Sequence, residues 1–178
     1  MLFRSLRGNI FIYQGEELGL PQADIAFEHL RDPEAIANWP LTLGRDGART
    51  PLPWEAKPMR SKVPPWLPVP DEHLALAVDA QEQDPGSQLA FTRRVLSLRN
   101  RSPALTHGTI HVLEASADVL AFERRSHGEQ MLCVFNLGNA PRTWSPPDVD
   151  AWRIVEVSRT LRDWTLPGLS GLVAQRNR

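Results

Sequence analysis

The sequence predicts an α+β fold, in which a proline-rich first part and one long helix precede a small antiparallel β-sandwich. Three observations lead to this fold class. Residues 1–70 show little sustained hydrophobic periodicity, residues 85–101 repeat apolar side chains at helical spacing, and the chain after Gly108 alternates with a period of two. Several short alternating strands joined by turns are typical of a β-sandwich.

The composition fits a folded protein of one ordinary domain or two small ones. Of the 178 residues, 42% are hydrophobic, which is enough for a packed core. The formal net charge of -1 argues against a nucleic-acid partner, because nucleic-acid binders usually carry a clustered basic excess. No apolar stretch approaches the roughly 20 residues of a membrane span, so we expect no membrane partner.

The sequence offers no pattern typical of a metal site or a cofactor site. Cys133 is the single cysteine, which excludes an internal disulfide, and its apolar neighbours favour an inert buried thiol. The five histidines lack metal-binding spacing, and each is interpreted as an imidazole in a loop or on the surface of a strand. The beginning of the chain lacks the features of a signal peptide, so we expect a cytoplasmic protein.

The first part of the chain contains one short regular segment. Asn9–Tyr13 is an apolar run stopped by Gln14 and Gly15, and we interpret it as a buried strand of a parallel sheet. Residues 16–21 then form a single turn closed by glycine and proline. The long segment that follows is rich in proline. It also carries tryptophans, which disordered segments lack, so we predict an ordered functional loop around Trp39, Trp54 and Trp66.

The clearest helix runs from Pro85 to about Arg101. Asp84 is a good N-cap and Pro85 suits the first helical position. The apolar stripe has the spacing i, i+4, i+7 and consists of Phe91, Val95 and Leu98. Pro103 ends the helix.

The chain after Gly108 is predicted to form strands with short connections. Hairpin turns are expected at residues 127–128 and 137–139. The predicted strands are Thr109–Ala115, Val119–Arg125, Gln130–Asn136, Trp152–Val157 and Gly171–Ala174.

Glu16 and Glu17 form an adjacent carboxylate pair that could act as an acid and a base. Adjacent residues at a strand end point to opposite faces, however, so the two carboxylates would diverge. We therefore favour a structural or solvated pair over a catalytic one.

Residues 44–54 combine two arginines, a turn-forming Asp-Gly, a rigid Pro-x-Pro and an indole. Such a loop presents guanidinium donors beside an aromatic plane. This pair suits a polyhydroxylated ligand, because the donors reach hydroxyl oxygens and the indole of Trp54 covers sugar C–H groups. An arginine paired with a nearby carboxylate in a packed loop remains the alternative for Arg45 and Arg49.

Several motifs resemble those of one enzyme family. Arg7–Gly19 resembles the eighth-strand signature of α-glucosidases in the α-amylase superfamily of glycoside hydrolases. Phe27–Pro33 and Gly44–Trp54 are similar to the oligo-1,6-glucosidase-like branch, and Pro65–Val69 and Asp84–Ser87 continue the match in order. The resemblance covers nearly the whole chain and identifies it as the C-terminal portion of such an enzyme.

The resemblance implies a (β/α)8 TIM barrel followed by an antiparallel β-sandwich. Residues 1–105 are then a truncated barrel remnant with the eighth strand, a long loop and a helix, and residues 106–178 are the sandwich domain. The missing N-terminal barrel portion becomes a possible partner.

The resemblance also implies a retaining mechanism with two catalytic carboxyl groups. In the family, the nucleophile lies in a Gly-Phe-Arg-x-Asp pattern and the stabilising aspartate in a His-Asp pair. Neither pattern occurs in these residues. We therefore expect no catalytic residue here and no hydrolysis of malto- or isomalto-oligosaccharides by this chain alone.

Individual roles follow from the matched positions. The arginine that matches Arg49 contacts glucose in the innermost subsite of the family, and we expect Arg49 and Trp54 to bind an oligosaccharide or glucoside weakly. Tyr13, Gln14 and Glu16 match the barrel mouth and are expected to have structural roles. A stand-alone carbohydrate-binding or interaction module remains the alternative function.

Overall fold

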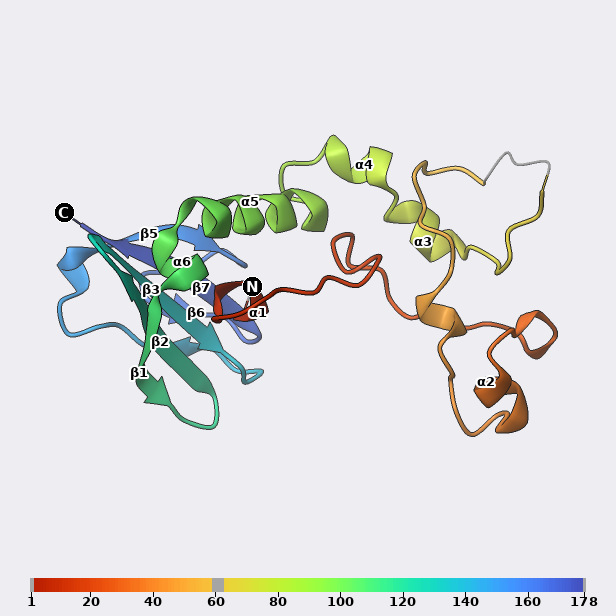
Figure 1. Cartoon of the computed structure of the whole chain (residues 1–178), viewed down its shortest axis with the longest axis horizontal. Coiled ribbons are helices and arrows are strands. Elements are labelled where there is room, and N and C mark those ends of the chain that lie inside the picture. The colour runs from red at the N-terminus through yellow and green to blue at the C-terminus, as the bar shows by residue number, and fades with distance from the viewer. Residues whose placement is uncertain (1, 59–62, 178) are drawn as a thin grey trace. The chain divides into compact units, whose positions relative to one another are not determined.

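The computed structural model describes residues 2–58 and 63–177 (Figure 1). The chain divides into two compact units. The sheet unit comprises Met1–Ile10 and Arg93–Arg178, and the loop unit comprises Phe11–Thr92. The domain boundary predicted between residues 105 and 106 separates the barrel from the C-terminal domain of a complete enzyme, and it stays a prediction. None of the helices in the described residues has the length and apolar character needed to cross a membrane.

The loop unit consists of turns and short helices, and its described residues form no strand. Backbone turns organise its beginning. The amides of Leu18 and Leu20 both donate to the carbonyl of Gly15, which confirms the turn predicted over residues 16–21. The helical segments are η1 Phe27–His29, α2 Pro33–Ala37, η2 Asp46–Ala48, α3 Asp71–Ala75, α4 Val78–Glu82 and the start of α5 Gln88–Arg101.

The strand predicted at Asn9–Tyr13 is wrong. A strand of a parallel sheet needs neighbouring strands that exchange backbone hydrogen bonds with it. The described residues supply no such neighbour at this segment, and the side chain of Phe11 is 90% exposed. An apolar run alone therefore does not define a strand.

The sheet unit contains an antiparallel five-strand sheet in the order β1-β2-β3-β7-β5 (Figure 1). Strands β4 and β6 form a separate two-strand sheet. The strands are β1 Thr109–Ala115, β2 Val119–Ser126, β3 Glu129–Asn136, β4 Arg142–Thr143, β5 Trp152–Val157, β6 Thr165–Leu166 and β7 Ser170–Arg176. The remaining helices are α1 Leu2–Ser5, α6 Pro103–His107 and η3 Val149–Ala151.

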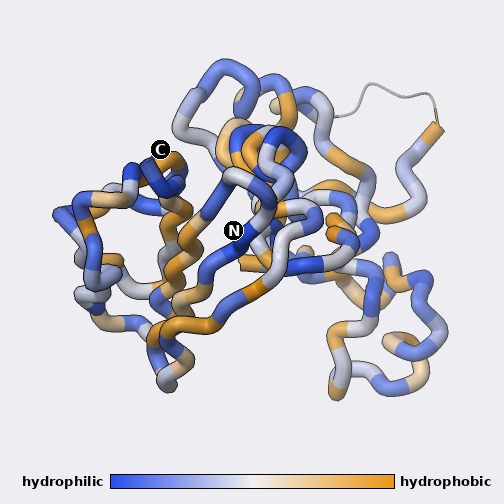
Figure 2. Tube along the Cα trace, turned by 60° about the vertical axis from the view of Figure 1, so that its left-hand side comes forward, coloured by the Kyte–Doolittle hydropathy of each residue, from blue (hydrophilic) through white to orange (hydrophobic). Residues whose placement is uncertain are grey.

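Both faces of the five-strand sheet are covered by apolar side chains. Alternation along β3 sends Leu132 and Val134 to one face and Met131 and Cys133 to the other. The first face packs with Leu166 of β6, and the second packs with side chains of α6. Figure 2 shows apolar residues recurring along the strands. Burial raises the pKa of the Cys133 thiol to about 12, as suits an inert core residue.

The strand predictions agree closely with the structure. Strands β1 and β5 have the predicted bounds, and β2 and β3 are each one residue longer than predicted. Strand β7 is longer by one residue at its start and two at its end. The sequence does not predict β4 and β6, because a two-residue strand has no detectable period. The predicted β-sandwich would consist of two comparable sheets. The structure instead has one five-strand sheet, with helices on one face and the small β4–β6 sheet on the other.

Helix α5 begins three residues later than predicted, at Gln88. The hydroxyl of Ser87 accepts from the amide of Ala90 at 3.1 Å, so Ser87 caps the helix. The side chain of Asp84 instead accepts from the amide of Gly86 at 2.8 Å and forms a local turn. Two candidate caps stand three residues apart, and the second one starts the helix.

A buried arginine of α5 holds the first residues of the chain on the sheet unit. The guanidinium of Arg99 is nearly inaccessible, and no carboxylate contacts it among the described residues. It donates to four backbone carbonyls, those of Arg4 at 3.0 Å, Leu6 at 2.8 Å, Gly8 at 2.7 Å and Leu105 at 2.8 Å. Burial lowers the pKa of Arg99 from its ordinary value.

Arg124 of β2 makes a second contact of this kind. Its side chain is fully buried and donates to the carbonyls of Ser5 and Gly108. Burial lowers its pKa as well. Two cationic side chains thus supply the hydrogen bonds that the irregular N-terminal backbone lacks.

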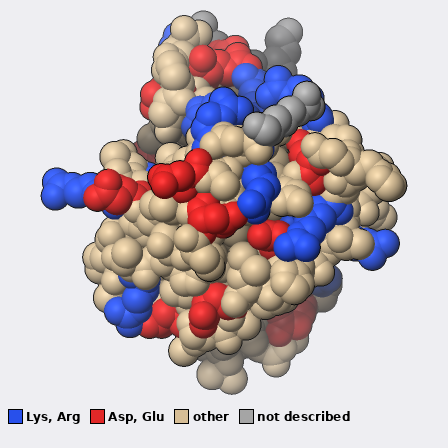
Figure 3. All heavy atoms as spheres, turned by 90° about the vertical axis from the view of Figure 1, so that its left-hand side faces the viewer, with Lys and Arg blue, Asp and Glu red and all other residues tan. Residues whose placement is uncertain are grey.

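Basic and acidic side chains lie next to one another on the face shown in Figure 3. This mixture agrees with the formal net charge of -1. The surface of this face resembles that of an ordinary globular protein rather than a basic nucleic-acid-binding patch.

Replacing Arg99 with Met is expected to lower the free energy of unfolding by about 2–4 kcal/mol, because buried carbonyls lose their donors. Arg101→Met is the matched control, since Arg101 lies on the same helix but is exposed. Its expected effect is below about 0.5 kcal/mol. Urea unfolding followed by circular dichroism measures both. Equal stabilities of the two variants would contradict the role of Arg99.

Candidate functional site

Two aspartates clamp the two stretches of the loop unit that carry the family-like motifs. Asp46 accepts the backbone amides of Arg31 at 2.6 Å and Asp32 at 2.8 Å. Asp32 in turn accepts the backbone amide of Arg45 at 2.9 Å and its guanidinium at 3.0 and 2.8 Å. We call these reciprocal bonds the Asp32–Asp46 clamp. It fixes residues 44–46 against the start of α2.

Asp32 is the central charged group of this clamp. It also accepts the amide of Glu34 at 3.3 Å and so caps α2. The guanidinium of Arg45 hydrogen-bonded to Asp32 holds the pKa of that carboxyl well below its usual range. Arg45 is therefore committed to a structural ion pair, which was the alternative open for the two arginines of this loop.

Close packing accounts for both glycines of the loop. Gly44 has a positive φ of +59°, and a Cβ there would lie 2.4 Å from the Cβ of Ala35. A Cβ on Gly47 would lie 2.2 Å from the carbonyl oxygen of Ala23. The Gly-Arg-Asp-Gly part of the motif is thus explained by packing and hydrogen bonding within the loop unit.

His73 of α3 anchors the other end of this loop. The ring is 1% exposed, with Nε2 2.8 Å from the carbonyl of Pro21 and Nδ1 3.1 Å from the hydroxyl of Thr50. A carbonyl can only accept, so Nε2 carries the proton and Nδ1 accepts from Thr50. The prediction of an imidazole in a loop or on the surface of a strand is wrong for His73. The burial of His73 could not be predicted, because the residues that contact it, Pro21 and Thr50, are distant in the sequence.

Tyr13 and Gln14 join the same assembly from the beginning of the loop unit. The amide of Gln14 donates to the carbonyl of Thr50 at 3.2 Å. Residues matched to the barrel mouth therefore lie directly beside the loop that carries Arg49.

A groove of about 630 Å³ opens beside these contacts. Trp54 and Trp66 are 67% and 53% exposed on its lining. The guanidinium of Arg49 has no hydrogen-bond or ion-pair partner among the described residues, in contrast to Arg45. The complete lining is Tyr13, Gln14, Arg49, Pro51, Leu52, Trp54 and Trp66. We call it the aromatic groove.

Glu16 lies outside the aromatic groove. It lines a smaller pocket of about 230 Å³, which also contains Tyr13, Gln14 and His73. The neighbouring Glu17 bends back and accepts the amide of Gly15 at 2.9 Å. The two carboxylates thus have different surroundings, in line with a pair that does not act together.

Four of the five site residues predicted from the sequence line the aromatic groove, namely Tyr13, Gln14, Arg49 and Trp54. Trp66 belongs to the functional loop predicted from the sequence but has no predicted binding role, and sequence reasoning missed His73, which lines the smaller neighbouring pocket. Both Trp54 and Trp66 directly follow a proline, and this shared pattern in the sequence could have indicated a common role. The described residues contain no group of three or more side chains suited to hold a metal ion.

Residues 1–108 match the family described as alpha amylase, catalytic domain. The chain belongs to this family. The match ends one residue before β1 begins at Thr109.

Sequence relatives identify the branch of the alpha-amylase family. The chain is 43% identical over 148 residues to a probable alpha-glucosidase of Rhizobium meliloti (strain 1021), covering 82% of this chain and 27% of the relative. It is 29% identical over 150 residues to Maltase A1 of Drosophila melanogaster, covering 80% and 26%. With the oligo-1,6-glucosidase of Parageobacillus thermoglucosidasius, the identity is 26% over 164 residues, covering 80% and 29%. The predicted resemblance is confirmed, and the chain spans between a quarter and a third of these relatives.

Solved structures agree with the sequence comparison. The alpha-glucosyl transfer enzyme XgtA superposes with a TM-score of 0.86 at 38% identity, covering 99% of this chain and 34% of that one. The trehalose-6-phosphate hydrolase of Bacillus licheniformis gives a TM-score of 0.82 at 24% identity, covering 98% and 37%, and shows a common fold. The present chain thus has a partial alpha-amylase fold.

Acid is expected to loosen the loop unit through Asp32. The ordinary pKa of 3.8 applies in the unfolded state and the folded pKa is lower. The stabilisation is therefore complete above about pH 5 and is lost as the pH falls through 3.8 toward the folded pKa. Asp32→Asn should lower stability at pH 7 and flatten this acid dependence in a tryptophan-fluorescence titration. The exposed Asp24→Asn serves as the control, and an unchanged acid profile in Asp32→Asn would contradict the clamp.

Proposed function

We propose that this chain supplies the C-terminal part of an α-glucosidase that cleaves malto- or isomalto-oligosaccharides by a retaining mechanism. Residues 1–105 contribute the long loop and the helix of the barrel remnant in this proposal, and residues 106–178 the C-terminal β domain. The aromatic groove contacts a glucosyl unit, and the catalytic carboxyl groups come from the remaining part of the barrel. The relatives that support this proposal are named alpha-glucosidases and oligo-1,6-glucosidases.

One observation supports the sugar contact above the others. Among the described residues the guanidinium of Arg49 has no partner, in a groove that also exposes two indole rings, while Arg45 is neutralised by Asp32. A free guanidinium offers several donors to hydroxyl oxygens, and indole faces cover the apolar C–H side of a pyranose. Gln14 adds an amide at the edge of the same groove.

The same groove explains why hydrolysis is not expected from these residues alone. A retaining glycosidase needs two carboxyl groups about 5–5.5 Å apart on either side of the scissile bond. None of the described residues that line the aromatic groove is an aspartate or a glutamate. Arg49 can hold a sugar, but it can neither attack the anomeric carbon nor protonate the leaving oxygen.

The purified chain is therefore expected to give no release of glucose from maltose or isomaltose, and no aryl release from an aryl α-glucoside, above the uncatalysed rate. The measurement is an end-point glucose assay on a preparation shown to be free of host glucosidase. Turnover that is lost in Glu16→Gln or Glu17→Gln would overturn this expectation, because it would reveal an independent active site.

Arg49→Ala is expected to weaken maltose binding about tenfold, since one charge-assisted set of hydrogen bonds is lost. Trp54→Ala should have a comparable effect through the lost stacking surface. Matched controls outside the groove are Arg31→Ala and Trp39→Ala, which should bind like the original chain. Ligand-detected nuclear magnetic resonance suits the millimolar dissociation constants expected of an incomplete pocket.

The same titration separates the proposal from a stand-alone carbohydrate-binding module. Micromolar binding of an oligosaccharide by the chain alone would favour the module, whereas millimolar binding that depends on Arg49 supports an incomplete enzyme pocket. Equal binding by Arg49→Ala and Arg31→Ala would rule out the assigned role of Arg49.

A further inference from the structure

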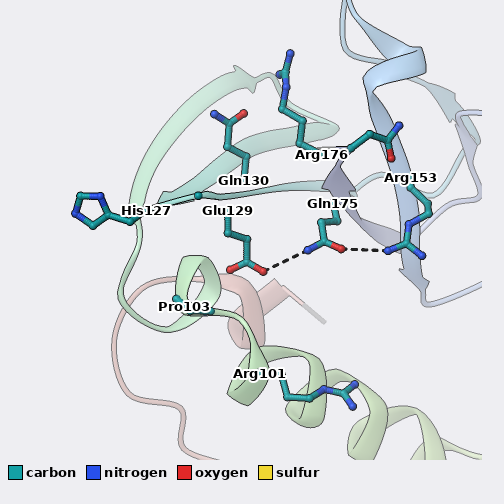
Figure 4. A pocket seen from close by; sticks show the side chains of 10 residues that line it. Arg101, Pro103, His127, Glu129, Gln130, Arg153, Gln175 and Arg176 are labelled. Atoms are coloured by element: carbon teal, nitrogen blue, oxygen red, sulfur yellow. Dashed lines mark hydrogen bonds between the residues drawn. The ribbon is translucent and has the colours of Figure 1, made fainter.

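A second groove, of about 660 Å³, lies in the sheet unit at one end of the five-strand sheet (Figure 4). The turn between β2 and β3, the start of β5, the end of β7 and the junction of α5 with α6 surround it. We propose that this groove binds an oxyanion, the phosphate or carboxylate group of a small molecule, through Arg101 and Arg153. We call it the arginine groove, and the proposal is independent of the aromatic groove.

Strand register places the key side chains on one face of the sheet. Arg153 of β5 and Gln175 of β7 are direct cross-strand partners, and Gln175 is also paired with Met131 of β3. Met131 packs on the helix-covered face, so Gln175, Arg153 and Glu129 share that face. Figure 4 shows Gln130 and Arg176 directed to the other side of the sheet.

A chain of hydrogen bonds orients the guanidinium of Arg153. Its Nη2 donates to Oε1 of Gln175 at 3.2 Å, and Nε2 of Gln175 donates to Glu129 at 3.5 Å. Glu129 is already engaged, since its other oxygen accepts from the hydroxyl of Ser102 at 2.8 Å and the amide of Ala104 at 2.9 Å. Among the described residues, the guanidinium of Arg153 therefore bonds only to a neutral amide.

Arg101, the last residue of α5, supplies the second available charge. Its guanidinium has no hydrogen-bond or ion-pair partner in the described part of the chain. Arg176, by contrast, is neutralised by Asp148 at 2.6 Å and lies 5.3 Å from the ring centre of Trp152. Two unneutralised guanidinium groups thus flank one groove, and such groups bind carboxylates and phosphates through paired hydrogen bonds.

The lining also distinguishes an anion from a neutral sugar. It contains no tryptophan, tyrosine or phenylalanine among the described residues. Neutral sugars depend on an aromatic face for much of their contact area, as the aromatic groove provides with Tyr13, Trp54 and Trp66. Donor-rich walls without an indole, phenol or phenyl ring match the many acceptor atoms of an oxyanion.

The test is a titration of the ¹⁵N-labelled full chain with inorganic phosphate, citrate and maltose at low salt. Phosphate or citrate should shift the amide signals around Arg153 and Gln175 with saturation in the millimolar range. Arg153→Gln and Arg101→Gln should each weaken this binding about fivefold or more, as removal of a charged donor predicts. Arg142→Gln is the control, because Arg142 is already paired with Asp118.

The arms of the titration identify the ligand. Saturation by phosphate alone assigns a phosphate group, and saturation by citrate alone assigns a carboxylate. Absence of saturation with either anion, an equal loss in Arg142→Gln, or saturation of the same signals by maltose would each overturn the proposal. Signal mapping on the original chain keeps the test decisive even where a variant loses its fold, and Arg153→Lys should retain part of the binding.

Discussion

Buried backbone polar groups need partners, and in this protein side chains supply many of them. The loop unit has no described strands, so its amides and carbonyls cannot form ladders. Gln81 bonds the carbonyls of Leu18 and Leu76 and the amide of Leu89, and the Asp32–Asp46 clamp does the same for residues 31–34 and 45. In the sheet unit, Arg99 serves the irregular N-terminal segment in this way. The conformation of the irregular backbone therefore depends on hydrogen bonds from buried polar side chains.

This constraint divides the family motif into two parts with different purposes. Gly44, Arg45, Asp46 and Gly47 are all consumed by close packing and internal hydrogen bonds. Arg49 follows two residues after Gly47, and its side chain has no hydrogen-bond or ion-pair partner among the described residues. Residues 44–47 thus form a rigid support for Arg49. Arg45 is paired with Asp32, whereas Arg49 has no such carboxylate partner among the described residues.

The sequence predicts the sheet far better than the loop unit, for physical reasons. Apolar residues alternate with polar ones in the sequence of its strands, as Ile110 and Val112 do in β1, and this period predicts them even though most side chains of β1 are exposed. The clamp residues carry no such signal, because Asp32 and Asp46 find their partners through the fold and not through spacing. The strand predicted at Asn9–Tyr13 fails for a related reason: pairing is a property of neighbours, which an apolar run cannot reveal.

The two grooves differ in local chemistry, and we therefore propose a different ligand class for each. In the aromatic groove, Arg49 acts beside Trp54 and Trp66, so one charge serves a ligand held largely by apolar contact. In the arginine groove, the described lining residues beside Arg101 and Arg153 carry no indole, phenol or phenyl ring. A ligand proposed for this groove would therefore be held mainly by charge. A guanidinium by itself specifies neither sugar nor anion. Its neighbours decide, since stacking surface favours a polyol and a second uncompensated cation favours an oxyanion.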